Sequence, residues 1–325
     1  MKRRRDLLFL LGAAALSPRA VLAQSKQPVL IGCLFSGSRE TDSELLGAFK
    51  EGLSALGWKE GSGVVFEERW ADGRLDRIPA LAEELAAKRP ALIFAVPAYP
   101  AAAAAKAAPK TPVVVLTGDP VAVGLVKSYS RPGGTITGLS NFNPVISEKF
   151  LELLLAAAPK SRRIGFLFDT TASGVALHKV NARRSVAQHL VQAHFAEAGR
   201  REEVEPALSR LAKEGAQALI VMPGVVARLE RRRIVEFALA QRWPVIGSRR
   251  EWVEEGALLS YGVDQLERYR RAAYYVDRIL KGAKPGDLPI EQATRFELVV
   301  NLKTARAIGL TISQDLLFRA DKVIE

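Results

Sequence analysis

The sequence is poor in the residues and motifs on which many enzymes depend. It has one cysteine, Cys33, and three histidines, His178, His189 and His194, whose spacing is not that of a zinc site. A Gly-x-Gly-x-x-Gly turn, a phosphate-binding Gly-Lys-Ser loop and a Gly-x-Ser-x-Gly elbow are missing. These absences argue against catalysis, and we expect neither a cofactor nor a metal. A lone cysteine forms no internal disulfide, and we predict that Cys33 packs in the core because it falls inside an apolar strand.

The apolar stretch near the start, Leu7–Leu16, is too short to span a bilayer as a helix. It follows the basic Arg3–Arg5 and precedes Val21–Ala23, a small-residue cleavage site, so residues 1–23 are predicted to be a signal peptide. The arginines also suit a twin-arginine export signal, with the Sec route left open. The alternative to a signal peptide is that this apolar stretch forms the first helix of the fold. Cleavage after Ala23 leaves 302 residues, enough for two domains, and no cysteine sits at the cleavage site for lipid attachment.

The formal charge of +12 falls to about +8 without residues 1–23, so the chain stays basic. Arg228, Arg231, Arg232 and Arg233 are predicted to share one helix, with none of the interleaved aromatic residues that a nucleic-acid platform needs. We therefore expect solvated helix faces rather than a nucleic-acid partner.

Short apolar runs alternate with amphipathic helices along the chain, which predicts parallel sheets covered by helices on both faces. In the first half the expected strands are Val29–Phe35, Val64–Trp70, Ala91–Val96 and Val113–Leu116. After Ser140 the series restarts, with strands expected at Arg163–Phe168, Leu190–Ala196, Ala218–Met222 and Pro244–Ile246.

Three further strands, Thr135–Ser140, Leu258–Gly262 and Phe296–Val300, are predicted to carry the chain between the two halves. The prediction is therefore an α/β fold of two doubly wound parallel-sheet lobes joined by three crossing strands. Residues 24–139 and 263–290 form lobe 1, and residues 140–262 and 291–325 form lobe 2. Ligands of such sheets bind beyond the carboxyl ends of the strands, so we expect an interlobe cleft.

A series of short motifs follows in order along nearly the whole mature chain. They are Leu56-Gly57-Trp58, Arg69–Arg74, Gly118-Asp119-Pro120-Val121, Arg131-Pro132-Gly133-Gly134, Thr137–Ser140, Arg250–Glu254, Ser260-Tyr261-Gly262, Ile279–Pro285, Phe296–Asn301 and Arg319-Ala320-Asp321. With them the chain resembles the bacterial ABC-transporter substrate-binding proteins, the family that includes tryptophan and tyrosine uptake proteins. The resemblance implies a type I periplasmic-binding-protein fold, a cleft that closes on ligand, and delivery to a membrane permease.

Two loops depart from what the resemblance leads us to expect. Val96–Tyr99 stands where members commonly have a Gly-Thr-Pro type loop, and Asp169–Ser173 stands where an Asn-Pro-rich loop is usual. Both would face the cleft. The ligand is therefore predicted only as an amino acid, aromatic or not, or a related carboxylate.

Loops that lead into helices expose N–H groups that favour a carboxylate. Ser36, Gly37 and Ser38 suit that role, as do Ala98 and Tyr99 through their backbone.

Asp119 is expected to pair with an ammonium group, although capping the helix that follows it is the alternative. Tyr261 either stacks on a ligand or packs the hinge. In lobe 2 the candidate ligand contacts are Asn141, Asp169 and Thr170. Three tryptophans are instead predicted to be structural anchors: Trp58, Trp70 and Trp252.

The predicted function is that of an exported, periplasmic solute-binding protein, a monomer that captures a small molecule by hinge closure for the permease and ATPase of an ABC importer. A ligand-sensing module that docks on a membrane receptor is the alternative, because it would use the same fold and export signal. An exported enzyme is the third class. Genes for a permease and an ATPase beside this one would favour transport.

Overall fold

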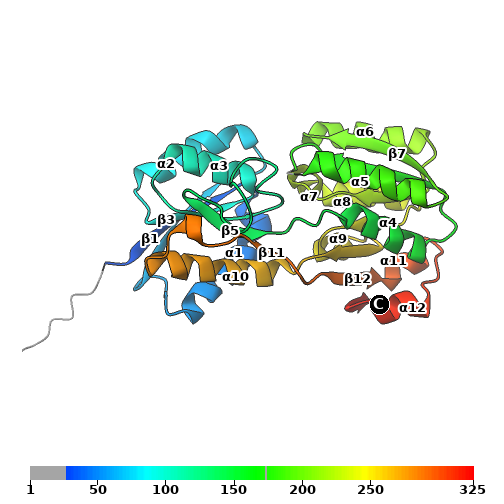
Figure 1. Cartoon of the computed structure of the whole chain (residues 1–325). Helices are drawn as coiled ribbons and strands as arrows, with labels where there is room; N and C mark the ends of the chain where they lie inside the picture. Colours follow the sequence, from blue (N-terminus) through cyan, green and yellow to red (C-terminus); the bar gives the residue numbers. More distant parts are fainter. Residues whose placement is uncertain (1–26, 173) are drawn as a thin grey trace, which may run out of the picture.

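The computed structural model describes residues 27–172 and 174–325, which form two lobes side by side (Figure 1). In each lobe a mostly parallel sheet is covered by helices on both faces. The predicted fold of two parallel-sheet lobes is confirmed. The predicted signal peptide, residues 1–23, lies outside the described residues.

Within the described residues, lobe 1 is built on a six-stranded sheet in the order β2-β1-β3-β4-β5-β11. Every neighbouring pair in it is parallel. The strands are β1 (Val29–Phe35), β2 (Val64–Trp70), β3 (Leu92–Val96), β4 (Val113–Thr117), β5 (Ile136–Ser140) and β11 (Glu291–Gln292). The order reverses between β1 and β3, and ligands of doubly wound sheets bind at such a reversal.

The helices of lobe 1 cover both faces of this sheet. They are α1 (Arg39–Ala55) and α10 (Gln265–Leu280) on one face, and α2 (Ile78–Ala87) and α3 (Ala98–Ala107) on the other, with 3₁₀ turns at Leu75–Arg77 and Pro285–Asp287. The apolar stripe of α1, which includes Phe49 and Leu53, packs against α10 residues such as Val276. Cys33 is fully buried in the same core, as predicted.

Lobe 2, over its described residues, has a seven-stranded sheet in the order β7-β6-β8-β9-β10-β12-β13. Its strands are β6 (Arg163–Asp169), β7 (Gln192–Ala198), β8 (Ala218–Val221), β9 (Val245–Gly247), β10 (Leu259–Gly262), β12 (Glu297–Asn301) and β13 (Lys322–Ile324). β12 runs antiparallel to β10, whereas the other neighbours are parallel. The reversal of strand order falls between β6 and β8.

The helices of lobe 2 form the two outer layers. They are α4 (Ile146–Ala157), α5 (Val175–Gln188), α11 (Leu302–Ala307) and α12 (Gln314–Arg319) on one face, and α6 (Arg201–Lys213), α7 (Val225–Leu229), α8 (Arg231–Ala240) and α9 (Arg250–Glu254) on the other. The prediction of one helix for Arg228 and Arg231–Arg233 is wrong, because Glu230 separates α7 from α8. Arg228 therefore belongs to a different helix from the other three.

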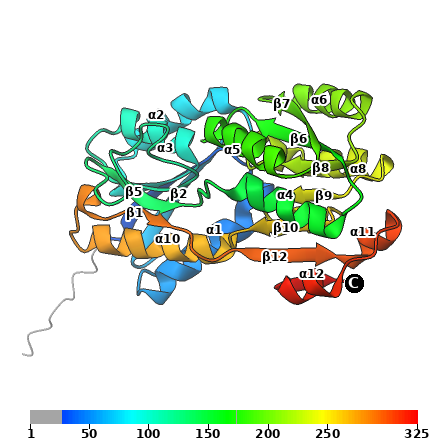
Figure 2. The same cartoon turned by 45° about the vertical axis from the view of Figure 1, so that its right-hand side comes forward.

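The chain passes between the lobes three times, at residues 141–145, 263–264 and 293–296 (Figure 2). The predicted crossing strands border these segments, but each strand belongs to a single sheet: β5 to lobe 1, and β10 and β12 to lobe 2. The predicted start of the last lobe-2 segment at residue 291 also differs from the structure. Glu291 pairs with Leu139 at the edge of the lobe 1 sheet, so the crossing begins only after Gln292.

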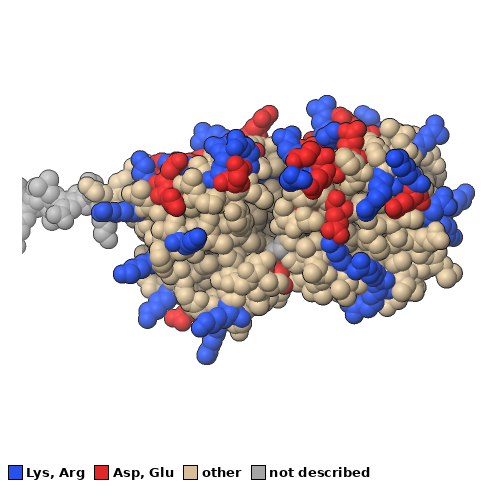
Figure 3. All heavy atoms as spheres, turned by 90° about the horizontal axis from the view of Figure 1, so that it is seen from above, with Lys and Arg blue, Asp and Glu red and all other residues tan. Residues whose placement is uncertain are grey.

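Charged side chains of both signs lie close together over both lobes (Figure 3). Arg232, whose side chain is 77% exposed, pairs with Glu236, and Arg233 pairs with Glu205. Exposed pairs of this kind contribute little to stability. Much of the positive charge thus lies on solvated helix faces, as expected, but the side chain of Arg228 is only 15% exposed.

Candidate functional site

A cavity of about 230 Å³ lies between the two lobes. Its walls come from residues directly after β1, β3 and β4 in lobe 1 and after β6, β8 and β9 in lobe 2. The loops that follow the strands on either side of a reversal in strand order diverge and leave a crevice. The volume is somewhat below the roughly 300 Å³ at which clefts for drug-sized ligands begin, so the cavity suits a small metabolite.

Most of the cavity wall is apolar. Lobe 1 contributes Phe35, Leu45, Val96, Leu116 and Tyr269, and lobe 2 and the crossings contribute Phe142, Ile146, Met222, Trp252 and Phe296. Aromatic rings face the cavity from both lobes. Burying apolar surface stabilises by roughly 25 cal/mol per Å², so these walls favour a ligand with an apolar or aromatic part.

An ion pair joins the lobes across the cleft. Arg228 of α7 donates from Nη1 to Asp42 Oδ1 at 2.8 Å and from Nη2 to Asp42 Oδ2 at 3.3 Å, and Asp42 belongs to α1 of lobe 1. Both residues line the cavity, with side chains 15% and 8% exposed. Burial lowers the pKa of Arg228, and the Asp42 carboxylate offsets that only in part. The pair is made only while the lobes are together.

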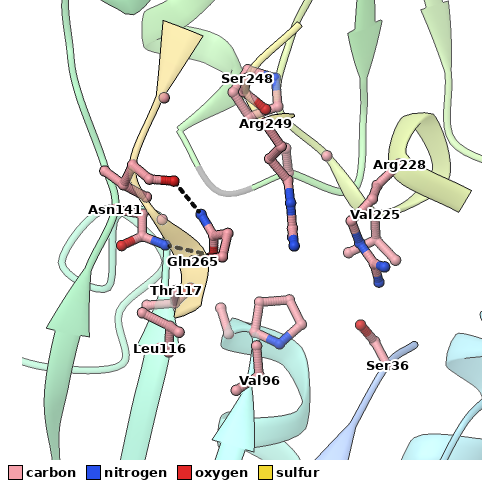
Figure 4. A pocket seen from close by; sticks show the side chains of 18 of the residues that line it. Ser36, Val96, Leu116, Thr117, Asn141, Val225, Arg228, Ser248, Arg249 and Gln265 are labelled. Carbon is pink, nitrogen blue, oxygen red and sulfur yellow. Dashed lines mark hydrogen bonds between the residues drawn. The ribbon is translucent and has the colours of Figure 1, made fainter. Parts of the chain in front are cut away.

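Arg249, which follows β9, points into the cavity near Arg228 (Figure 4). Its Nη2 donates to Glu251 Oε1 at 2.7 Å. Burial opposes the charge of Arg249, but Glu251 outweighs this effect and raises the pKa of the guanidinium. The cavity lining, as far as the chain is described, thus carries two guanidinium groups and one carboxylate.

Arg268 of α10 organises the opposite end of the cavity, where the chain crosses between lobes. Its Nε donates to Asn141 Oδ1 at 3.1 Å, and its Nη2 donates to the backbone oxygens of Ser140 at 3.2 Å and Glu291 at 2.9 Å. Asn141 in turn donates from Nδ2 to Gln265 Oε1 at 3.4 Å (Figure 4). Arg268 therefore ties the first crossing to the strand before the third and orients the amide of Asn141.

Two buried polar atoms at this hinge end, Thr117 Oγ1 and His178 Nδ1, have no hydrogen-bond partner within the described residues. Thr117 is 3% and His178 5% exposed, and both line the cavity. The first crossing brings them to the same end. The Asn141 N–H donates to the Thr117 carbonyl at 2.7 Å, and the Phe142 and His178 ring centroids are 5.2 Å apart. Burial lowers the pKa of His178 to about 4, against a smaller opposite effect of Asp119, so the imidazole is neutral near pH 7.

Five of the sequence-predicted contacts line the cavity: Ser36, Gly37, Ala98, Tyr99 and Asn141. A Cβ on Gly37 would lie 1.9 Å from Asp42 Oδ2, so the ion pair requires glycine there. Ala98 and Tyr99 begin α3, which has no side-chain cap. The positive end of this helix therefore faces the cavity.

The other five, Ser38, Asp119, Asp169, Thr170 and Tyr261, are not among the residues that line the cavity. Ser38 caps α1 by accepting from the Thr41 N–H at 3.3 Å. Tyr261 stacks on Phe296 with 5.5 Å between ring centroids, next to the third crossing. Thr170 is exposed.

The two predicted carboxylates both hold backbone N–H groups. Asp119 Oδ1 accepts from the N–H groups of Val121 and Ala122 and from the Tyr129 hydroxyl, at 3.0 to 3.1 Å. These bonds hold a turn, because no helix lies between β4 and β5 among the described residues, so the alternative prediction that Asp119 caps a helix is wrong.

Asp169 is buried at the end of β6. Its Oδ2 accepts from the N–H groups of Val226 and Ala227, at 2.6 and 3.1 Å. It therefore caps α7, the helix that carries Arg228.

Sequence reasoning missed Asp42, Arg228, Arg249 and His178 and assigned Trp252 to structure alone. One signal was available: Asp42 lies on the stripe that continues through Leu45, Leu46 and Phe49, and a carboxylate on an apolar helix face needs a partner. The partner itself, 186 residues away, has no local signal.

Two properties of the described residues bear on the class of site. They hold no group of three or more His, Cys, Asp or Glu side chains that could bind a metal ion. Nor do they include a helix of the length and hydropathy needed to cross a membrane.

Comparisons with known proteins agree with this architecture. Residues 38–324 match the family described as ABC transporter substrate binding protein. A tyrosine-binding protein from Clostridioides difficile (strain R20291) is 26% identical over 275 residues, which cover 81% of this chain and 75% of that protein.

Solved structures show the same fold. A conserved domain protein from Vibrio cholerae (25% identity) and an ABC domain from Streptococcus pneumoniae in complex with L-Trp (23% identity) both have a TM-score of 0.85, covering 91% of this chain and 100% of theirs. The ligand-free, open structure of a substrate-binding protein with adhesive properties from Clostridium difficile has a TM-score of 0.68 at 24% identity, covering 91% and 99%. The chain belongs to the family of ABC transporter substrate-binding proteins.

Proposed function

We propose that the protein captures a zwitterionic amino acid with an aromatic side chain and holds it by closing the two lobes. The observation that carries this proposal is the composition of the interlobe cavity. One carboxylate, Asp42, and two guanidinium groups, Arg228 and Arg249, share a lining that is otherwise largely apolar and aromatic. A zwitterion offers one charge to each kind of group. The tyrosine-binding relative and the neighbour with bound L-Trp support the choice of an aromatic side chain.

The backbone of the ligand is proposed to lie at the Asp42–Arg228 end. Arg249, with Ser36 and the start of α3 at Ala98 and Tyr99, suits the ligand carboxylate, since helix N-termini and guanidinium groups both favour anions. Asp42 suits the ammonium group. A carboxylate accepts about four hydrogen bonds, so Asp42 can keep Arg228 as a partner when the ligand binds.

Hinge closure is the proposed mechanism. The three crossings are short, and Arg268 fixes the first relative to β11, so an opening motion would be concentrated in residues 141–145, 263–264 and 293–296. Opening would separate Asp42 from Arg228 and divide the cavity between the lobes. A ligand that touches both lobes binds the closed form better and shifts the population toward it.

The proposed partners are the permease and ATPase of an ABC importer, to which a periplasmic, monomeric carrier delivers its ligand. Family membership and the signal-like N-terminal sequence support export and this partnership. The proposed role is binding without catalysis.

A thermal-shift screen of residues 24–325 against the standard amino acids, sugars and carboxylic acids tests the proposal. Ligand at about 100 times its Kd stabilises the folded state by about 2.7 kcal/mol, so aromatic L-amino acids should raise the Tm by several degrees. Small-angle scattering with the same ligand should show a smaller radius of gyration than without it. A shift with sugars alone would refute the ligand class, and an unchanged radius at saturation would refute closure.

A further inference from the structure

Two arginine–glutamate pairs lie at α9 and differ in their surroundings. Arg250 and Glu254 pair at 2.9 Å on the surface, with side chains 44% and 47% exposed. Arg249 and Glu251 pair at 2.7 Å, and the Arg249 side chain is 17% exposed and lines the ligand cavity. Glu251 is not among the described residues that line this cavity. It lines a separate space of about 20 Å³, shared with Thr41 of α1 and large enough for about one water molecule.

Glu251 occupies one edge of the Arg249 guanidinium. Its Oε1 accepts from Nη2 at 2.7 Å and from Nε at 3.2 Å, and its Oε2 accepts from Nε at 3.4 Å. A guanidinium holds five N–H groups in a fixed plane, so these bonds leave the two N–H groups of Nη1 free. Within the described residues Nη1 makes no hydrogen bond, and it is not one of the buried atoms without a partner. Because the Arg249 side chain points into the cavity (Figure 4), Nη1 is open to a ligand.

Arg228, the second guanidinium in the cavity lining, is engaged at both of its terminal nitrogens. Nη1 and Nη2 each donate to one oxygen of Asp42. A ligand carboxylate that approached Arg228 end-on would have to displace Asp42, whereas it meets an unoccupied Nη1 on Arg249. The two arginines therefore differ in role: Arg228 joins the lobes, and Arg249 is free to bind an anion.

We infer that Glu251 is a positioning residue, which holds the Arg249 guanidinium with Nη1 turned toward the carboxylate of the ligand. The inference deepens the proposed function and rests on it. An arginine side chain has several rotatable bonds, and a ligand that must first order such a side chain binds less tightly than one that meets it already fixed. Glu251 fixes Arg249 from outside the cavity, so it acts on the ligand only through the arginine.

The electrostatics of the pair support this role. Burial opposes the charge of Arg249, but Glu251 outweighs this effect and raises the pKa of the guanidinium. Burial also acts to raise the pKa of Glu251, but Arg249 outweighs it and holds the pKa of this carboxyl below its usual range. Each residue therefore keeps the other ionised at neutral pH, and their hydrogen bonds are of the strong, charge-assisted kind.

Calorimetry with amino acids and their carboxamides tests the inference, because a carboxamide keeps the ring and the amino group but loses the negative charge. The probes are L-tryptophan with L-tryptophanamide and L-tyrosine with L-tyrosinamide, at about pH 6.5, where the amino groups are protonated. The wild-type protein should bind each amino acid at least about thirtyfold more tightly than its amide. Glu251→Gln should lower this ratio by about tenfold, the equivalent of one hydrogen bond to a charged group, by weakening the amino acid alone.

Glu254→Gln is the matched control, because it removes the same charge from the same helix and breaks the Arg250 pair outside the cavity. It should leave the ratio unchanged. Glu251→Asp separates position from charge, since it keeps the carboxylate but shortens the side chain by a methylene group. It should also lower the ratio, and it serves as the test if Glu251→Gln does not fold.

Several results would overturn the inference. An unchanged ratio in Glu251→Gln would mean that Arg249 keeps its position alone, and a higher ratio would mean that Glu251 competes with the ligand for Arg249. Equal losses for amino acid and amide would leave Glu251 a structural role only, and a wild-type ratio in Glu251→Asp would mean that charge acts without position. In each case the proposed function stands, because aromatic amino acids still bind. If no aromatic amino acid binds, the proposed function fails and this inference fails with it.

Discussion

The two ends of the interlobe cavity handle polar groups in opposite ways. At one end, charges on the two lobes are paired across the cleft, Asp42 with Arg228, and Arg249 has Glu251 beside it. At the hinge end the cavity-lining residues are uncharged, and two buried side-chain atoms, Thr117 Oγ1 and His178 Nδ1, have no hydrogen-bond partner within the described residues. Buried charges without partners are far more costly than buried hydroxyl or imidazole groups. A cavity that must also exist without ligand can therefore leave neutral groups unsatisfied, but it must pair its charges.

The largest expected effect comes from removing a charge at the paired end. Arg228→Met leaves Asp42 as an uncompensated carboxylate, a change that costs about 3 to 5 kcal/mol in a buried site. The lobes can separate and return Asp42 to water, so we expect the loss to appear as opening. Affinity for L-tyrosine should fall by about a hundredfold or more, and scattering should show a larger radius of gyration.

Asp42→Asn provides the double-mutant cycle for this pair. The double variant Asp42→Asn/Arg228→Met should lose much less ligand-binding free energy than the sum of the losses in the two single variants. In the double variant neither residue leaves a charged partner unpaired. Additive losses, or a compact Arg228→Met variant with nearly unchanged affinity, would show that the interlobe pair does not hold the closed form.

The next effect concerns the neutral end and follows from the depressed pKa of His178. Its pKa is about 4 in the folded protein and 6.5 when unperturbed, so between these values the unfolded chain binds a proton that the folded chain does not. Stability from this group is therefore full above pH 6.5 and declines as the pH falls toward 4, by up to about 3 kcal/mol.

Urea unfolding of the ligand-free protein from pH 7 to pH 4 measures this change. His178→Phe should remove that part of the decline, while His189→Phe, a change at a histidine that does not line the cavity, should keep it. Parallel pH curves for wild type and His178→Phe would mean that the ring is not held neutral by burial.

The smallest expected effect comes from a substitution that tests closure. Gly73→Ala adds a methyl group where the two lobes are in contact. Gly73 lies in lobe 1 with φ +77°, and a Cβ there would lie 2.7 Å from Leu229 Cδ1 of lobe 2. Gly73→Ala should weaken binding by about tenfold, and Leu229→Ala added to it should restore part of the affinity. Gly61→Ala has similar backbone strain, with φ +85° and no atom within 4 Å of the added carbon, and should leave affinity unchanged.

The fold could be predicted in most of its elements because its signals are local. Runs such as Val113–Leu116 and the stripe of α1 carry their own periodicity, and the restart after Ser140 separates the lobes. The exceptions were at edges and joints: β11 has two residues, too few to show a pattern, and α7 and α8 are adjacent enough to read as one helix.

The site residues that could be predicted are those that come soon after the end of a strand. Ser36, Gly37, Ala98, Tyr99 and Asn141 follow strands and therefore reach the cavity.

Asp119 and Asp169 also lie at the carboxyl ends of strands, but nothing local shows whether such a carboxylate faces a ligand or accepts from backbone N–H groups. Arg228 looked like one of four surface arginines, because its partner Asp42 lies in the other lobe. Contacts that exist only when two lobes meet leave no trace in either stretch of sequence.

The most direct test of the account compares L-tyrosine with its two single-charge analogues by calorimetry on residues 24–325. Tyramine lacks the carboxylate and phloretic acid lacks the amino group, while both keep the phenol. Each should bind at least about thirtyfold more weakly than L-tyrosine, because a buried charge left without its partner costs about 2 to 5 kcal/mol. If either analogue bound as tightly as L-tyrosine, the Asp42, Arg228 and Arg249 end would not be reading a zwitterion.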